Sequence, residues 1–235
     1  MQTILISVNA MIVTISAIEE KAKITALREK IKALTWRDGR ATAGKVASAV
    51  KQNEQAIVSD AAGKAIQDEL LQVVEGNAVL KAAARPRRIS PLLISKTRDG
   101  GHYGAHVDNA IMGSGKSRLR TDISFTLFLT DPEDYDGGEL VIHTAGVTSH
   151  IKAEAGQLVL YPSSSIHEVR PVTSGERIVC VGWIESLISD PTQRELLFDL
   201  ENLRASLRAK LEPQAPELLM LDKSISNLLR MWGVP

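Results

Sequence analysis

Hydrophobic residues recur three or four positions apart near both ends of the chain, a spacing that places them on one face of a helix. A first helix is expected over 19–34, and the Ser-x-x-Glu spacing at 16–19 predicts a capping box before it. A second helix is expected over 60–75, and Asn77 is expected to cap a third, shorter one. The apolar positions are Ile24, Leu27, Ile31 and Leu34 in the first helix and Ile66, Leu70, Val73 and Val74 in the second.

The pattern changes at Pro86, after which short β-type runs alternate with turn residues as far as about residue 187. Strands are expected in RISPLLISKT, YGAHVDNA, TDISFTLFLT, GELVIHT, TSHIKA, QLVLYP, HEVRPV and RIVCVGWIES. About eight short strands with regular turns indicate a sandwich or a double-sheet jelly roll, so the fold class is mainly β with flanking helices (α+β). Gly137 and Gly138 are expected to form a bulge or turn with no chemistry of their own.

The segments outside this β-rich region are assigned less directly. MIVTI, at 11–15, is expected to be a strand, and 36–57 is interpreted as loop and irregular extended chain. A leucine stripe follows Asp190, and a further helical segment covers 216–232; both are expected to pack on the sheet, and the stripe also permits a homo-oligomer. The stripe consists of Leu196, Leu197, Leu200, Leu203 and Leu207. The domains expected are an N-terminal strand and helices (1–85), the jelly-roll domain (86–187) and a C-terminal helical segment (188–235).

Composition narrows the classes of function. The chain has 235 residues with 28 Lys and Arg against 28 Asp and Glu, so its charge gives no sign of nucleic-acid binding. No apolar run approaches the roughly 18–20 residues of a membrane span, and the N-terminal stretch lacks the basic start and cleavage site of a signal peptide, so the cytoplasm is the expected compartment. Cys180 is the single cysteine, which excludes an intrachain disulfide, and it is expected to be a small buried strand residue.

One motif carries candidate chemistry. In YGAHVDNA, His106 and Asp108 are two residues apart, so in a strand both side chains would project from the same face. Such a pair is either a surface ion pair or part of a metal site. His167 would complete a two-histidine, one-carboxylate set, the arrangement of non-haem Fe(II) oxygenases. Arg177 follows His167 by ten residues across a hairpin turn, and its planar fork suits a carboxylate.

Other residues near the motif carry weaker signals. His143 and His150 have no partner at a ligand-like spacing and are interpreted as structural. His102 flanks the motif and is a candidate for lining the mouth of the site. Asn109 is either a residue that steadies a metal ligand or a turn-facing side chain.

The motifs together resemble a known family. YGAHVDNAIM, RTDISFTLFLTDPEDYDGGELVI, LVLYPSSSIHEVRPVTSGER and RELLFDL look like the PKHD-type hydroxylases, and the likeness runs from about residue 11 to 210. These are bacterial Fe(II)- and 2-oxoglutarate-dependent oxygenases of the prolyl/lysyl-hydroxylase-like class, and they include the iron-uptake-associated PiuC-like proteins. The segment DGRATAG, at 38–44, is similar to the N-terminal part of the family.

The resemblance implies a double-stranded β-helix in which His106, Asp108 and His167 hold Fe(II). It also implies that Arg177 binds the distal carboxylate of 2-oxoglutarate, that O₂ is the oxidant and that L-ascorbate is the reductant. The substrate would be a peptidyl proline or lysine, or a small molecule connected with iron acquisition. A hydroxylated product, succinate and CO₂ would be released.

The sequence departs from the family where a tyrosine is common, because this chain has Thr97 there. Tyr103 or Tyr161 is the candidate to supply the missing contact with the co-substrate. Two other functions stay open: a cupin-like metalloenzyme that does not use 2-oxoglutarate, and a non-catalytic iron-binding or sensing module on the same fold. In the cupin-like case, more histidines and a glutamate would be expected around the metal.

Overall fold

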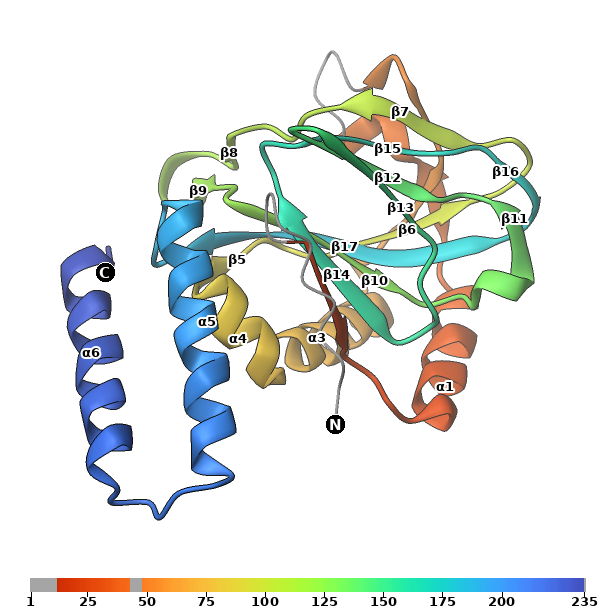
Figure 1. Cartoon of the computed structure of the whole chain (residues 1–235). Coiled ribbons are helices and arrows are strands. Elements are labelled where there is room, and N and C mark those ends of the chain that lie inside the picture. The colour runs from red at the N-terminus through yellow and green to blue at the C-terminus, as the bar shows by residue number, and fades with distance from the viewer. Residues whose placement is uncertain (1–11, 43–47, 235) are drawn as a thin grey trace.

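Two β-sheets face one another, and helices cover the outer side of the larger sheet (Figure 1). The computed structural model describes residues 12–42 and 48–234. The chain is mainly β with flanking helices, and the expected jelly-roll fold class is confirmed. How the chain divides into domains stays a prediction.

The larger sheet has the strand order β1-β14-β10-β17-β6-β4-β2, with β5 added beside β17. All of its strand pairs are antiparallel. Its strands are β1 (Val13–Ser16), β2 (Trp36–Asp38), β4 (Glu54–Ala56), β5 (Pro86–Ile89), β6 (Leu93–Thr97), β10 (Ile123–Phe128), β14 (Gln157–Pro162) and β17 (Arg177–Ser186).

The smaller sheet lies over the larger one and has the order β13-β12-β15-β7-β3 (Figure 1). Its strands are β3 (Lys51–Gln52), β7 (His102–His106), β12 (Leu140–Thr144), β13 (Val147–Ile151) and β15 (Ile166–Val169). Two short ribbons complete the β structure: β8 (Ile111–Met112) with β9 (Leu119–Arg120), and β11 (Tyr135–Gly137) with β16 (Val172–Gly175). The 3₁₀ turns are η1 (Gly39–Thr42), η2 (Gly115–Ser117) and η3 (Pro132–Asp134).

Strand alternation divides the buried side chains of the larger sheet between two layers. On β10, Phe125 and Leu127 face the helices and join the main hydrophobic core. Phe128 belongs instead to the smaller cluster between the sheets. Ser124 and Thr126, on the same side as Phe128, line a cavity there. The interior of the sandwich is therefore apolar at one end and polar at the other.

Three of the described helices begin at side-chain caps that the sequence provides. The helices are α1 (Lys21–Lys32), α3 (Ala61–Gly76), α4 (Ala78–Ala84), α5 (Pro191–Arg208) and α6 (Pro216–Trp232). Asp60, Asn77 and Asp190 each accept a hydrogen bond from the backbone N–H three residues later, which satisfies donors that the first turn leaves open. No helix within the described ranges is long and apolar enough to cross a membrane.

Three expectations about the flanking segments are wrong. Ser16 ends strand β1, and α1 begins after Glu20 with no side-chain cap, so the predicted capping box does not form. The segment expected to be a loop, 36–57, contributes β2, β3 and β4, which are too short to show a period and are held by their neighbours. The leucine stripe is not one buried face: Leu197 is buried, whereas Leu196 and Leu203 are 45% and 48% exposed.

Other expectations are confirmed. Strand β1 covers most of the predicted 11–15, although Met11 lies outside the described residues. Asn77 caps the short helix, and Cys180 is a fully buried free thiol on β17. The pairing of β11 with β16 shifts register at Gly137, so the expected bulge is present.

Candidate metal centre

Two neighbouring strands of the smaller sheet bring the histidines together. His106 ends β7, and it lies directly opposite His167 of β15 in the sheet register. Asp108 comes after the end of the strand, so it does not share a strand face with His106 as the spacing suggested. It reaches the same point because the chain bends beyond β7. One ligand atom from each of the three side chains lies within 4.8 Å of the other two, a group that could hold a metal ion.

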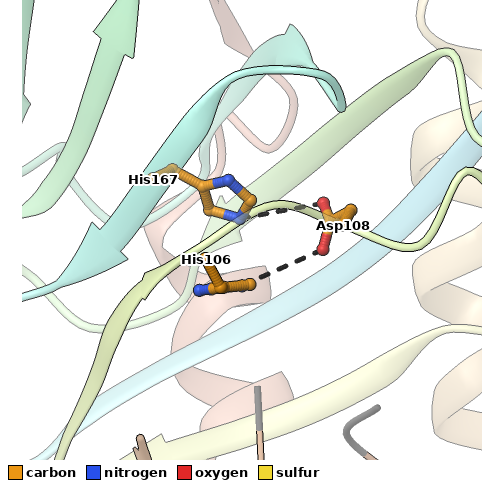
Figure 2. Close-up of side chains that lie close together, drawn as sticks. All are labelled: His106, Asp108 and His167. Carbon is orange, nitrogen blue, oxygen red and sulfur yellow. Dashed lines mark ion pairs between the residues drawn. The ribbon is translucent and has the colours of Figure 1, made fainter. Parts of the chain in front are cut away.

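Figure 2 shows both imidazoles facing the carboxylate of Asp108. The Nε2 atoms of His106 and His167 lie 3.9 Å from Oδ1 and 3.7 Å from Oδ2 of Asp108. The Nδ1 atoms lie 2.8 Å from the Gly104 carbonyl and 3.1 Å from the Ser165 carbonyl. Because a carbonyl only accepts, each Nδ1 must carry the proton. Each Nε2 therefore presents a lone pair to the centre, the tautomer that a metal ligand needs.

Burial keeps the imidazole of His106 neutral. Burial, and then the neighbouring His167, lower the pKa of His106 from 6.5 to about 4. A neutral imidazole is the form that binds metals, so His106 can act as a ligand throughout the neutral pH range.

An irregularity in β7 adds an aromatic wall to the centre. The register of β7 against β15 shifts, so that Tyr103 and His106, three residues apart, oppose residues only two apart on β15. The extra residue is a bulge, and it brings both rings to the same face. The Tyr103 ring stacks on His106 with centroids 3.7 Å apart. Tyr161 meets the ring of His167 edge-on at 5.0 Å.

Arg177 lies in the same cavity as the three candidate ligands, and it is only 2% exposed. Its guanidinium carbon lies 5.1 Å from the centroid of the Phe128 ring. Burial lowers the pKa of Arg177. Its Nε and Nη2 atoms are buried without a hydrogen-bond partner among the described residues. The buried Tyr135 phenol is a polar neighbour of Arg177 but does not pair with these two atoms at hydrogen-bond geometry. Buried arginine donors are normally paired, so Nε and Nη2 are candidates to bind an anionic ligand.

The tyrosines and Thr97 line this cavity as well. Thr97, on β6, lies opposite Arg177 in the sheet register, so the departure from the family pattern falls beside the arginine. Burial and then Asp108 raise the pKa of Tyr103 to about 12, and burial raises that of Tyr161 further, so both phenols stay protonated donors. Gly138 also adjoins the arginine, because a Cβ there would lie 3.0 Å from the Arg177 Cδ.

The remaining sequence candidates lie outside the group of ligand atoms. His102 is at the far end of β7 with its Nδ1 3.3 Å from the Gly100 carbonyl, and it does not line the cavity. His143 pairs with the Thr148 hydroxyl at 3.1 Å, away from the centre. Asn109 lines the cavity, and its backbone carbonyl accepts a hydrogen bond from the Thr121 hydroxyl at 2.7 Å.

Sequence reasoning missed Ser124, whose hydroxyl lies 2.6 Å from Oδ2 of Asp108. The side chain is 2% exposed and sits on the cavity-facing side of β10. The available signal was a serine placed between the large apolar residues of TDISFTLFLT. That signal is weak, since a small polar residue in a buried strand can satisfy many different partners.

Comparison with known proteins supports the class suggested by this geometry. The family model of the 2OG-Fe(II) oxygenase superfamily matches residues 92–185, and that of the PKHD-type hydroxylase C-terminal domain matches residues 192–233. A prolyl hydroxylase from Trichoplax adhaerens, solved in complex with a hypoxia inducible factor peptide fragment, has a TM-score of 0.56 at 14% identity. The match covers 76% of this chain and 84% of that one, and it concerns the fold alone. The fold and the matched family model define an enzyme of the 2OG-Fe(II) oxygenase class.

Two relatives identify the family within that class. A PKHD-type hydroxylase of Hyphomonas neptunium is 50% identical over 210 residues, covering 89% of this chain and 94% of that protein. A PKHD-type hydroxylase of Synechococcus elongatus is 46% identical over 223 residues, covering 95% of this chain and 100% of that protein. The chain belongs to the PKHD-type hydroxylase family.

Proposed function

We propose that this protein hydroxylates a C–H bond of an organic substrate, using Fe(II) held by His106, Asp108 and His167 and 2-oxoglutarate held by Arg177. In the overall reaction, substrate, O₂ and 2-oxoglutarate give hydroxylated substrate, succinate and CO₂. One oxygen atom enters the product and the other enters succinate. The observation that carries the proposal is the convergence of three ligand atoms and a buried arginine with unpaired donors in one cavity.

The donor set suits ferrous iron. Two neutral imidazoles and one carboxylate form a facial set that leaves coordination positions open for a co-substrate and O₂. Iron, when bound, supplies the activation of O₂. The contribution of the chain is to hold the ligands in the correct tautomer and to exclude water with the apolar side chains between the sheets.

Arg177 suits the distal carboxylate of 2-oxoglutarate. Its fork can donate two parallel hydrogen bonds to a carboxylate, and both unpaired nitrogens are removed from bulk water. Tyr103 and Tyr161, kept protonated by burial, are proposed as further donors to the co-substrate. Among the ion pairs of the described residues, none involves Arg177, so no protein carboxylate is paired with its fork.

Several features of the proposal rest on the family alone. L-ascorbate is proposed as the reductant that keeps the iron ferrous. The substrate is proposed to be a peptidyl residue or a small molecule, with a link to iron uptake and a cytoplasmic location as further hypotheses. Assembly into a homo-oligomer is a hypothesis supported by the exposed Leu196 and Leu203 of α5.

The proposal is tested by binding of ferrous iron under anaerobic conditions. We expect one iron per chain in the unaltered protein and in Asp68→Ala, which removes an exposed carboxylate on α3. Asp108→Ala should bind iron at least tenfold more weakly, because an anionic ligand is lost. With air and 2-oxoglutarate, succinate should form only in the variants that bind iron. Equal iron binding by the Asp108 and Asp68 variants would contradict the ligand assignment.

A further inference from the structure

The position of Asp108 needs an explanation, because no strand fixes it. It follows the end of β7, and its backbone takes no part in the sheet ladder. Its side chain is nevertheless only 9% exposed and points at the two histidines. A carboxylate on a bend can rotate about two side-chain bonds, so a further contact is needed to hold it in one orientation.

That contact comes from a pair of serines outside the candidate ligand set. The Ser124 hydroxyl lies 2.6 Å from Oδ2 of Asp108, and 2.7 Å from the Ser163 hydroxyl. Each serine is 2% exposed, so water does not compete for these bonds. Ser124 sits on β10 between β14 and β17, where Tyr161 and Trp183 are its register partners. The Ser163 N–H donates to the Asp122 carbonyl at 3.2 Å, which fixes that serine too.

The chemistry of the groups sets the direction of the two bonds. An ionised carboxylate can only accept, so Ser124 must donate its single proton to Asp108. Ser124 then has only lone pairs left for its partner, and Ser163 must donate to it. Bonds arranged head to tail in this way polarise one another, and the bond to the carboxylate is charge-assisted. The pair thus holds one oxygen of Asp108 from β10 of the larger sheet and from the residue that follows β14.

We propose that Ser124 and Ser163 are positioning residues that hold Asp108 in the orientation required to bind the metal ion. This inference rests on the proposed function, because it assumes that Asp108 is a metal ligand. Ser124 acts directly on the carboxylate, whereas Ser163 acts only through Ser124. Through Ser124, the larger sheet, which carries Arg177, contacts the segment that follows β7 of the smaller sheet, the sheet that carries the histidines.

The test is the dissociation constant for Fe(II), measured anaerobically without co-substrate, together with urea unfolding of the metal-free protein. Ser124→Ala should raise the dissociation constant on the order of 10–100-fold, the usual effect of losing a partner of a metal ligand. Ser163→Ala should raise it less. The double variant should bind as Ser124→Ala does, because Ser163 has no other route to the carboxylate. Ser124→Thr, which keeps a hydroxyl, should restore most of the affinity.

Ser186→Ala is the matched control. Ser186 is fully buried and its hydroxyl is also hydrogen-bonded, to the Ile188 N–H at 3.1 Å, but it lies outside the cavity. Its removal should lower the stability of the metal-free protein and leave the affinity for iron unchanged. This contrast separates a positioning role from a loss of general stability.

Each other outcome has a defined meaning. If Ser124→Ala binds iron as tightly as Ser186→Ala, the positioning role is overturned while the ligand assignment stands. Additive effects of the two serine variants would overturn the relay from Ser163. If Ser124→Thr is as stable as the unaltered protein and binds as weakly as Ser124→Ala, the hydroxyl is not responsible. Failure of the unaltered protein to bind iron would overturn the proposed function, and this inference with it.

Discussion

Replacing Arg177 by methionine should affect the stability of the protein and its affinity for 2-oxoglutarate differently, and the two effects together define the role of this side chain. The substitution keeps an unbranched apolar stem of similar length and removes the charged fork. The fork is 2% exposed, with Nε and Nη2 unpaired, and burial outweighs the favourable effect of Tyr135 and Glu139 on its charge, so its loss removes a buried charge that is only partly compensated. The fold should not become less stable, although the contact with Phe128 is lost.

The effect on 2-oxoglutarate follows from the number of unpaired donors. Two nitrogens of Arg177 are without partners, and each hydrogen bond to a charged group contributes about 1.5–3 kcal/mol. The loss of both is therefore about 3–6 kcal/mol, and each 1.4 kcal/mol is roughly tenfold in affinity. We expect Arg177→Met to weaken 2-oxoglutarate binding by about 10²–10⁴-fold, with the affinity for iron unchanged. The affinity of Arg177→Lys for 2-oxoglutarate should lie between those of the unaltered protein and Arg177→Met, since lysine keeps the charge and loses the planar fork.

The assay is anaerobic titration of the iron-loaded protein with 2-oxoglutarate, paired with thermal unfolding of the metal-free protein. Arg194→Met is a matched control, because Arg194 is also buried, at 4% exposure, and donates to the Ile188 and Ser189 carbonyls outside the cavity. It should lose stability and keep its affinity for 2-oxoglutarate, the reverse of Arg177→Met. An affinity of Arg177→Met within threefold of the unaltered protein would refute the reasoning.

Three further predictions concern the pH dependence of stability, the backbone at Gly138 and the reactivity of the Cys180 thiol. Because the folded-state pKa of His106 is lowered from 6.5 to about 4, the unfolded state gains a proton first as pH falls, and the unfolding free energy of the metal-free protein should decrease between these values. Urea unfolding across this range should show a decrease that is smaller in His106→Gln; an equal decrease would contradict the assignment. Gly138→Ala forces a side chain onto a backbone at φ 70° and against Arg177, so calorimetry should show a loss of about 1–2 kcal/mol, with weaker 2-oxoglutarate binding. Unchanged 2-oxoglutarate binding would contradict the expectation that a side chain at this glycine displaces Arg177. Burial raises the pKa of Cys180 to about 12, so a thiol reagent should modify it only as fast as the protein unfolds, and rapid labelling of the native protein would contradict its burial.

The sequence predicted the larger features of the site because they depend on residue type and spacing. Two histidines, a carboxylate and an arginine in a β-rich region were enough to propose which residues meet, and the structure brings His106, Asp108, His167 and Arg177 into one cavity. The helices with clear apolar periods were also predicted within a few residues.

Features that depend on a partner strand could not be predicted. The bulge in β7 is a mismatch between two strands, so nothing within YGAHVDNA indicates that Tyr103 and His106 share a face. Strands β2, β3 and β4 are two or three residues long, too short to show alternation, and exist because longer neighbours pair with them. Ser124 was missed for the same reason, since its partner Asp108 is brought to it only by the fold.

We propose that one cavity holds both ferrous iron and 2-oxoglutarate. The most direct test is to add Fe(II) and then 2-oxoglutarate to the metal-free protein without oxygen, and to record the visible absorption of the 2-oxo acid chelated to ferrous iron. We expect the band to appear in the unaltered protein and to be absent in His167→Ala. Iron binding without the band would contradict the co-substrate assignment. A band of equal strength in His167→Ala would contradict the metal centre itself.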